Sequence, residues 1–351
     1  AALPLWATAG VDPATGGFRE ALTWTGEPAD PRRRARVQTR QAFVFATAAA
    51  DGVPGPWLAT AKAGMGFFLA HARRPDGLFA AELGLDGAQT DPTPRLYEHA
   101  FLLLALSALA AAEPEQGAWR REAHAIADGL DPFRLPAGGY REAGPEPYQA
   151  NAHMHLLEAF LAWEALEPAA RWRTRADEVA ELALSRFVDP ASGALLEFFE
   201  ADWSARRGPQ CVIEPGHQFE WAWLLDRWSS ARGETRVGGV VRRLFEVGRM
   251  GFDPAREVAV NGLDETLTAR DASARLWPQT EHLKAALALG ESGAALQAAR
   301  GLAVYLDTPA RGVWRERMRA DGGFVDEPSP ATSLYHLFVA FRELESWARE
   351  A

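Results

Sequence analysis

Six polar side chains recur at nearly equal spacing, each within a largely apolar stretch of the chain. They are separated by 59, 56, 62, 64 and 55 residues, and they are Arg40, His99, His155, His217, Glu281 and His336. Histidine titrates close to neutral pH and is suited to moving protons, while arginine stabilises negative charge that develops on oxygen. One such residue alone is best explained as a core polar group, but six in register indicate a shared pocket.

Each of these residues falls within the first two turns of a segment with helical periodicity. In one segment Leu156, Phe160 and Trp163 follow the i, i+4, i+7 spacing of a single apolar helix face. These segments form the more apolar set, expected to lie inside, and cover 37–50, 94–112, 148–166, 215–231, 278–289 and 332–348. A second set alternates with it, at 57–72, 117–129, 169–187, 235–250 and 292–306, with a short segment at 3–9.

Glycine-containing turns repeat with the same period of about 58 residues. Their anchors lie 61, 61, 55, 63 and 55 residues apart, at Phe18, Phe79, Tyr140, Leu195, Val258 and Val313. Strand-like alternation occurs only in short pieces beside these turns. We therefore predict an all-α fold in which twelve helices pair into six hairpins, stacked as an open solenoid or closed into a ring. If the inner helices run parallel, the six polar side chains meet at one end.

The composition excludes several classes of protein. The chain has 351 residues, 48% of them apolar and 24% charged, and its net charge of −10 argues against a nucleic-acid surface. The longest apolar run, residues 100–112, is too short to cross a bilayer, and no signal peptide opens the chain. We therefore expect a cytoplasmic protein without a membrane partner. The sequence contains no GxGxxG, GxxxxGK or GxSxG motif, so neither a nucleotide cofactor nor a serine nucleophile is predicted.

A metal site is the next alternative. Cys211 is the only cysteine, which excludes an intramolecular disulfide and any CxxC site. His153 and His155 with nearby glutamates offer ligands for zinc or manganese. Residues i and i+2 of a helix, however, diverge by about 200°, so these two histidines cannot readily share one ion. We predict no metal and no cofactor.

Five segments of the chain carry a family resemblance: RVQTRQAFVFA, NAHMHLLEAFLA, EPGHQFEWAWLL, LWPQTEHLKAALAL and ATSLYHLFVAF. They resemble the N-acylglucosamine 2-epimerase superfamily, which includes cellobiose 2-epimerase and the mannose isomerases. HMHLLEA and EPGHxFEW are the most specific signals. The resemblance runs from about residue 4 to 348 and implies an (α/α)6 barrel, in agreement with six hairpins. We therefore predict one domain over residues 1–351.

The resemblance also implies roles for particular residues. His217 of EPGHQFEW and His336 of SLYH match the two acid/base histidines of the family, and Arg40 matches its oxyanion-binding arginine. We expect His336 to remove the proton from C2 of a sugar, and Glu220, one helical turn after His217, to orient that histidine. With His99 added from the periodic set, the residues expected to bind substrate are Arg40, His99, Asn151, His155, Glu220, Trp277 and Glu281.

The reaction implied is proton removal next to a sugar carbonyl, through a cis-enediolate. Isomerisation returns the proton to C1, whereas epimerisation returns it to the opposite face of C2. The apolar run after His336 and the EPGHxFEW and PQTEHLKA runs look more like the mannose isomerase branch, so we predict an aldose–ketose isomerase. A sugar 2-epimerase of the N-acylglucosamine or cellobiose type is the alternative. Two other classes are a sugar-binding scaffold and a glycoside hydrolase that uses Glu220 and Glu281.

The expected partner is a small sugar, a monosaccharide or a disaccharide, and the expected assembly is a monomer or homodimer. Of the 37 basic residues only Lys62 and Lys284 are lysines. The arginines scatter over the whole chain, and their spacing locates no pocket for a phosphate or sulfonate group.

Overall fold

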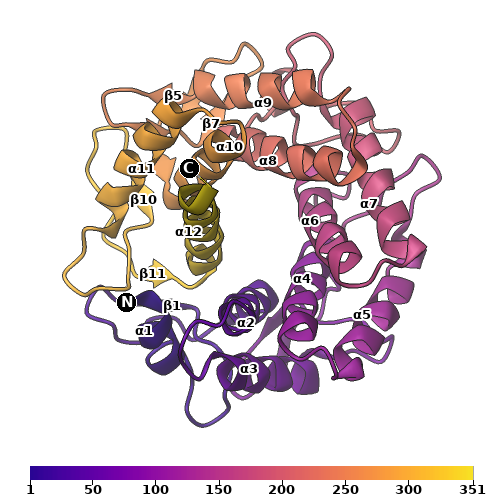
Figure 1. Ribbon diagram of the computed structural model, residues 1–351, viewed down its shortest axis with the longest axis vertical. Coiled ribbons are helices and arrows are strands. Elements are labelled where there is room, and N and C mark those ends of the chain that lie inside the picture. The colour runs from indigo at the N-terminus through magenta and orange to yellow at the C-terminus, as the bar shows by residue number, and fades with distance from the viewer. Residues whose placement is uncertain (351) are drawn as a thin grey trace.

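The computed structural model describes residues 1–350, and its helices form a closed ring of two layers (Figure 1). The inner helices are α2 (Ala35–Ala50), α4 (Leu96–Ala112), α6 (Ala150–Leu166), α8 (Pro215–Arg232), α10 (Leu276–Ala288) and α12 (Thr332–Glu350). The outer layer contains α1 (Ala2–Thr8), α3 (Trp57–Ala72), α5 (Gly117–Gly129), α7 (Ala170–Leu182), α9 (Gly238–Met250) and α11 (Ser292–Leu306). Each inner helix packs against the next, and α12 packs on α2 and closes the ring. The predicted all-α barrel of six helical hairpins is confirmed within these residues.

The helix boundaries differ from the predicted ones by a few residues at most, except for α7. Its helix ends at Leu182, and the residues that follow, Ala183–Phe187, form one wider π-helical turn. Helix α10 begins at Leu276, two residues before Pro278. Proline is tolerated in this first helical turn, because a backbone N–H there would have no acceptor within the helix. Two 3₁₀ turns complete the helical elements, at Asp131–Phe133 and Gly208–Gln210.

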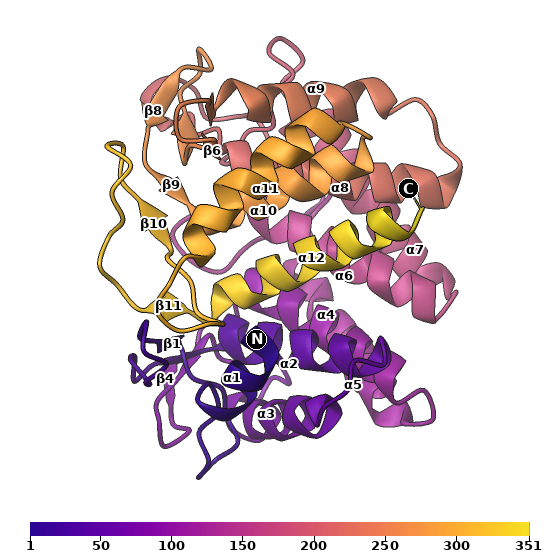
Figure 2. The same cartoon turned by 60° about the vertical axis from the view of Figure 1, so that its left-hand side comes forward.

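Short antiparallel strands collect at the end of the barrel where the inner helices begin (Figure 2). They are β1 (Ala21–Leu22), β2 (Arg33–Arg34), β3 (Glu82–Leu83), β4 (Gln89–Asp91), β5 (Phe252–Asp253), β6 (Val258–Ala259), β7 (Gly262–Leu263), β8 (Ala269–Asp271), β9 (Ala274–Arg275), β10 (Arg317–Met318) and β11 (Ser329–Pro330). They pair as β1–β11, β2–β3–β4, β5–β6, β7–β8 and β9–β10. The pair β1–β11, with Ala21 opposite Pro330, joins the two ends of the chain at this end of the ring.

Each of the repeated turns is held by one buried polar side chain, an arrangement we call the turn clamp. That side chain lies on the neighbouring inner helix in five hairpins and on β11 in the sixth. Gln38, for example, accepts the backbone N–H of Phe18 at 2.8 Å and donates to its carbonyl at 2.7 Å. A backbone N–H buried without a partner costs about 1–3 kcal/mol, so these side chains stabilise the fold. The clamps are Gln38–Phe18, His99–Phe79, His153–Tyr140, Gln218–Leu195, Gln279–Ala259 and Ser329–Trp314.

The core lies between the two helical layers and along the ring axis. The inner helices are buried on almost every face, which explains why they are more apolar than the outer ones, as predicted. No helix in the described part of the chain has the length and hydropathy needed to span a membrane.

Candidate active site

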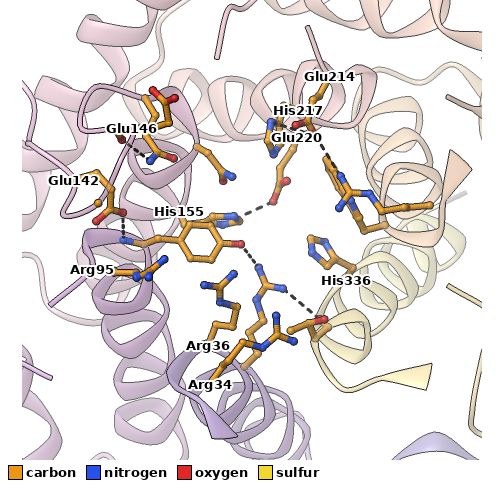
Figure 3. Close-up of a pocket in the computed structure, with 18 of the residues that line it drawn as sticks. Arg34, Arg36, Arg95, Glu142, Glu146, His155, Glu214, His217, Glu220 and His336 are labelled. Atoms are coloured by element: carbon orange, nitrogen blue, oxygen red, sulfur yellow. Dashed lines mark hydrogen bonds and ion pairs between the residues drawn. The ribbon is translucent and has the colours of Figure 1, made fainter. Parts of the chain in front are cut away.

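A cavity of about 500 Å³ opens at the N-terminal ends of the inner helices (Figure 3). This volume lies within the usual range of small-molecule pockets, about 300–1,000 Å³. Seven of the nine predicted site residues line it: Arg40, Asn151, His155, His217, Glu220, Trp277 and His336. Glu281 lies behind the cavity wall, in contact with His336. His99 lies elsewhere.

His217 is held by carboxylates at the start of α8. Its Nδ1 lies 2.9 Å from Oε1 of Glu197 and 3.9 Å from Oε2 of Glu214. Burial alone would lower the pKa of this imidazole, but Glu197, Glu214 and Glu220 together raise it to about 10. Burial raises the pKa of Glu197 as well, but imidazole is the stronger base and takes the proton. His217 is therefore an imidazolium at neutral pH, able to act as an acid.

The expectation that Glu220 orients His217 is wrong. Glu197, which precedes α8 by 18 residues, bonds to the imidazole instead. Glu220 does follow His217 by one helical turn, but its carboxylate lies beside His155, with 3.9 Å between Oε1 and Nδ1. Neither oxygen of Glu220 has a hydrogen-bond partner among the described residues. Burial, together with the charge of nearby Glu281, raises the pKa of Glu220 well above its ordinary value, so this group takes up a proton more readily than an exposed glutamate.

His336 has the opposite electrostatic environment. Its Nδ1 lies 2.8 Å from Oε1 of Glu281, whose other oxygen lies 2.5 Å from the ammonium of Lys284. Burial and the positive charges of Arg40 and Lys284 lower the pKa of His336 well below its ordinary value. Because Nδ1 donates to Glu281, the neutral imidazole keeps Nε2 free to accept a proton. His336 is thus neutral, with one ring nitrogen able to accept a proton.

Trp277 lies between the two histidines and contacts both rings. Its ring centroid is 5.0 Å from that of His217 and 5.8 Å from that of His336. Gly216 makes this close packing possible, since a Cβ atom there would lie 2.4 Å from the indole. The indole thereby separates an acid and a base that face one cavity.

Arg40 lies against aromatic rings at the same end of the barrel. Its Nη2 donates to the hydroxyl of Tyr97 at 2.7 Å, and its Nη1 donates to the carbonyl of Thr332 at 3.4 Å. The guanidinium stacks over Phe101, 4.0 Å from the ring centroid. Its Nε is buried without a hydrogen-bond partner among the described residues.

His155 and Asn151 project from α6 into the cavity. Burial lowers the pKa of His155 to about 3, although Glu158 lies 3.4 Å from its Nδ1, so this imidazole is neutral. The side-chain oxygen of Asn151 is buried without a hydrogen-bond partner among the described residues. Both groups are suited to hydrogen-bonding the hydroxyls of a ligand.

Two groups of buried side chains have the geometry to hold a metal ion. Their potential ligand atoms lie within 4.8 Å of one another, in the groups His155–Glu158–Glu220 and Glu220–Glu281–His336. In the second group the ammonium of Lys284 already supplies positive charge at Glu281. His153 belongs to neither group, because its Nε2 accepts the N–H of Tyr140 in a turn clamp. The predicted divergence of His153 and His155 is therefore confirmed.

His99 does not reach the cavity. Its Nε2 accepts the backbone N–H of Phe79 at 3.0 Å, and its Nδ1 lies 2.7 Å from the carbonyl oxygen of Arg95. Both ring nitrogens are thus engaged by backbone, and the side chain is fully buried. The structure places His99 in the row of turn clamps with Gln38 and His153, and not in the row of cavity residues with Arg40 and His155.

This placement predicts opposite results for two substitutions. His99→Leu leaves the N–H of Phe79 buried without an acceptor, so we expect a loss of about 1–3 kcal/mol in the free energy of unfolding. His99→Gln restores the acceptor that Gln38, Gln218 and Gln279 provide in other hairpins, so we expect most of that stability to return. Urea unfolding and turnover per folded molecule measure both. A turnover loss above tenfold in a stable His99→Gln protein would contradict a purely structural role.

Further residues line the cavity that the sequence did not single out. Four of them are arginines, and the set is Arg34, Arg36, Arg95, Tyr97, Glu142, Ala143, Gly144, Pro145, Glu146, Gln149, Phe198, Glu214, Arg275, Glu316, Thr332 and Ser333. Many lie in the last residues before an inner helix or in its first turn. A search of the sequence for polar residues at the start of each predicted inner helix could have identified them.

The closed ring of six hairpins is an (α/α)6 barrel, and two histidines whose pKa values are shifted in opposite directions face one cavity at its end. The family model for N-acylglucosamine 2-epimerase (GlcNAc 2-epimerase) matches residues 16–340. The chain belongs to this family. It is accordingly an isomerase or epimerase that acts on a small sugar.

Its relatives include isomerases of both phosphorylated and free mannose. The mannose-6-phosphate isomerase of Rhizobium meliloti (strain 1021) is 43% identical, over 98% of this chain and 94% of the relative. The D-mannose isomerase of Thermobifida fusca is 30% identical, over 73% of this chain and 68% of the relative.

Solved structures show the same fold at lower identity. A crystal structure of D-mannose isomerase has a TM-score of 0.90 at 21% identity, covering 98% of this chain and 95% of the other. Cellobiose 2-epimerase from Spirochaeta thermophila DSM 6192 has a TM-score of 0.86 at 21% identity, covering 98% and 94%.

Proposed function

We propose that the protein is an aldose–ketose isomerase that interconverts a mannose-type aldose and a fructose-type ketose through a cis-enediolate. The observation that carries the proposal is the pair of histidines at one cavity, His217 held as imidazolium and His336 held neutral. Two titratable groups with pKa values moved in opposite directions are typical of an acid and a base in one reaction. The names of the two curated relatives support a mannose-type substrate.

The first step is ring opening, which exposes the carbonyl group. His217 donates its proton to the ring oxygen O5 as the C1–O5 bond breaks, and then accepts the proton of the O1 hydroxyl as C1 becomes an aldehyde. His217 is protonated again at the end of the step. Asn151, His155 and Glu220 hold the sugar hydroxyls and keep the open chain in place.

The second step moves a proton from C2 to C1. His336 Nε2 removes the C2 proton, the electron pair forms the C1–C2 double bond, and O1 gains negative charge. Arg40 stabilises the enediolate oxygens. His217 protonates O1 and receives the O2 proton, and His336 returns its proton to C1, which gives the ketose and restores both histidines to their starting states.

Incubation with mannose in deuterated water, without added metal, tests this function by NMR. We expect fructose to form. Deuterium should appear at C1 of the product whenever the proton held by His336 exchanges with solvent before it is returned to the sugar. Formation of glucose with deuterium at C2, and without fructose, would identify a 2-epimerase. No exchange and no product would leave a sugar-binding protein and contradict the proposal.

The proposed chemistry uses no metal ion. Lys284 and Arg40 supply the positive charge beside the carboxylates and the developing enediolate. We therefore expect kcat and KM to change by less than about twofold after exhaustive EDTA treatment, a change far below the effect of removing a metal that stabilises the transition state. Activity lost on chelation and restored by zinc or manganese would show that one of the two His–Glu groups binds a metal ion.

A further inference from the structure

The cavity has an arginine group on the wall formed by α2 and α4, which we call the arginine wall. Arg34 ends β2 and immediately precedes α2, Arg36 lies in the first turn of α2, and Arg95 immediately precedes α4. The three side chains are 28%, 27% and 38% exposed, so their guanidinium groups remain accessible from the cavity. Figure 3 shows them on the side opposite His217.

Two of these guanidinium groups are fixed in position from behind. Nε of Arg34 donates to Glu20 at 2.8 Å, and Nε and Nη2 of Arg36 donate to Glu98 at 2.8 and 2.5 Å. Glu20 and Glu98 are 1% and 2% exposed, so each carboxylate lies deeper than its arginine. Within the described residues, Nη1 of Arg34 and of Arg36 forms no hydrogen bond. Each group therefore keeps an oriented donor free.

Arg95 completes the arginine wall, and a glutamate beside it already has its oxygens hydrogen-bonded to backbone. Nη2 of Arg95 donates to Asp91 at 2.9 Å, and its Nη1 forms no hydrogen bond within the described residues. Glu142, an acidic residue near these arginines, accepts the backbone N–H groups of Leu96, Tyr97 and Ala143 at 2.6–2.9 Å. Its oxygens are thus engaged at the start of α4 and do not occupy the free arginine donors.

The proposed reaction already has positive charge at the reacting carbons from Arg40, Lys284 and the His217 imidazolium. Three further guanidinium groups with oriented, unused N–H donors are in excess of what a neutral sugar requires. Arginine donors match the oxygens of a phosphate, which they bind through paired charge-assisted hydrogen bonds. Partial exposure also suits a phosphate dianion, which loses less hydration at the mouth of a cavity than in its interior.

We propose that Arg34, Arg36 and Arg95 form an anion subsite that binds a phosphate monoester at the end of the sugar remote from the reacting carbons. The proposal deepens the proposed function and rests on it: C1 and C2 lie between His217 and His336, and the phosphate on C6 lies at the arginine wall. The substrate class is then a hexose 6-phosphate.

Comparing mannose with mannose 6-phosphate tests the subsite. We expect wild-type kcat/KM to favour the phosphorylated sugar by about 100-fold, since each charged hydrogen bond contributes roughly tenfold or more. Arg36→Gln and Arg95→Gln should each lower kcat/KM for mannose 6-phosphate by about tenfold and change that for mannose by less than about threefold. Arg95→Gln is the safer variant, because its partner Asp91 is one-third exposed, whereas Arg36→Gln leaves Glu98 buried and unpaired.

Arg32→Gln is the matched control. Arg32 lies two residues before Arg34, is 54% exposed and pairs with Asp30 outside the cavity, so both substrates should retain wild-type kinetics. Inorganic phosphate should inhibit mannose turnover competitively, with a Ki about tenfold weaker in Arg95→Gln.

The outcomes separate the subsite from the proposed function. The wild-type enzyme could show equal kcat/KM for mannose and mannose 6-phosphate, with both values lowered equally by the arginine substitutions. That result would overturn the subsite and leave the isomerase proposal intact. If neither sugar is isomerised, the isomerase is wrong, and calorimetric binding of inorganic phosphate then decides the subsite alone. Binding that weakens in Arg95→Gln but not in Arg32→Gln supports it, and binding that is absent or equal in both variants overturns it.

Discussion

His336→Asn is expected to abolish exchange of the C2 proton of the substrate with solvent, and to lower kcat by about 10²- to 10⁴-fold. Asparagine has no titratable nitrogen, so nothing in its place accepts the proton. The neutral imidazole now present depends on burial and on the positive charges of Arg40 and Lys284, and its Nδ1 is fixed by Glu281. NMR in deuterated water measures the exchange directly, and steady-state kinetics measure kcat.

A buried histidine outside the cavity provides the control for this experiment. His282 is fully buried, stacks on Phe219 with ring centroids 4.5 Å apart, and does not line the cavity. His282→Asn should lower the melting temperature and leave turnover per folded molecule within about threefold. If a well-folded His336→Asn protein behaves in the same way, His336 is a packing residue and the assignment of the base is wrong.

The sequence predicted the ring and most of the cavity because the repeat is strong, but spacing could not separate two rows of polar residues. Gln38 and Arg40 lie two positions apart on α2, as His153 and His155 do on α6, and in each pair the first is a clamp and the second faces the cavity. Repeat lengths vary by more than two residues. His99 therefore matched either row, and only the packing of α4 assigns it to the clamps.

Other parts of the site depend on contacts between segments that lie far apart in the sequence, and such contacts could not be predicted from the sequence pattern. Glu197, the partner of His217, lies outside any helix, 20 residues earlier, where nothing in its surroundings signals an ionisable site. The arginine wall combines residues from two hairpins within a chain that has 37 basic residues. Each arginine looks like a surface charge until the ring closes and places α2 beside α4.

The second large effect is expected at His217. His217→Asn removes the acid that protonates O5, so kcat/KM on mannose, which is mostly a closed pyranose, should fall by about 10²-fold or more. Glyceraldehyde cannot cyclise and needs no ring opening. Its C2 proton exchange should therefore fall much less in His217→Asn than in His336→Asn. Equal losses on both substrates would contradict the assignment of ring opening to His217.

The pH dependence of kcat/KM tests why His217 is an acid. Its pKa is raised to about 10, so the acid form persists through neutral pH and activity should fall only as the pH rises through about 10. The lowered pKa of His336 places the acidic limb below the ordinary histidine value of about 6.5.

Glu197→Gln should move only the alkaline limb. Removing the carboxylate 2.9 Å from Nδ1 leaves burial, which favours neutral imidazole, so the limb should shift to lower pH by about one unit or more. Glu214→Gln removes a carboxylate 3.9 Å away and should shift the limb less. The raised pKa of His217 also makes the free energy of unfolding depend on pH. Its stabilising contribution is complete below about pH 6.5 and is lost as the pH rises through the pKa of His217 in the folded protein, about 10. An alkaline limb that stays in place in Glu197→Gln would mean that His217 is not the group that titrates there.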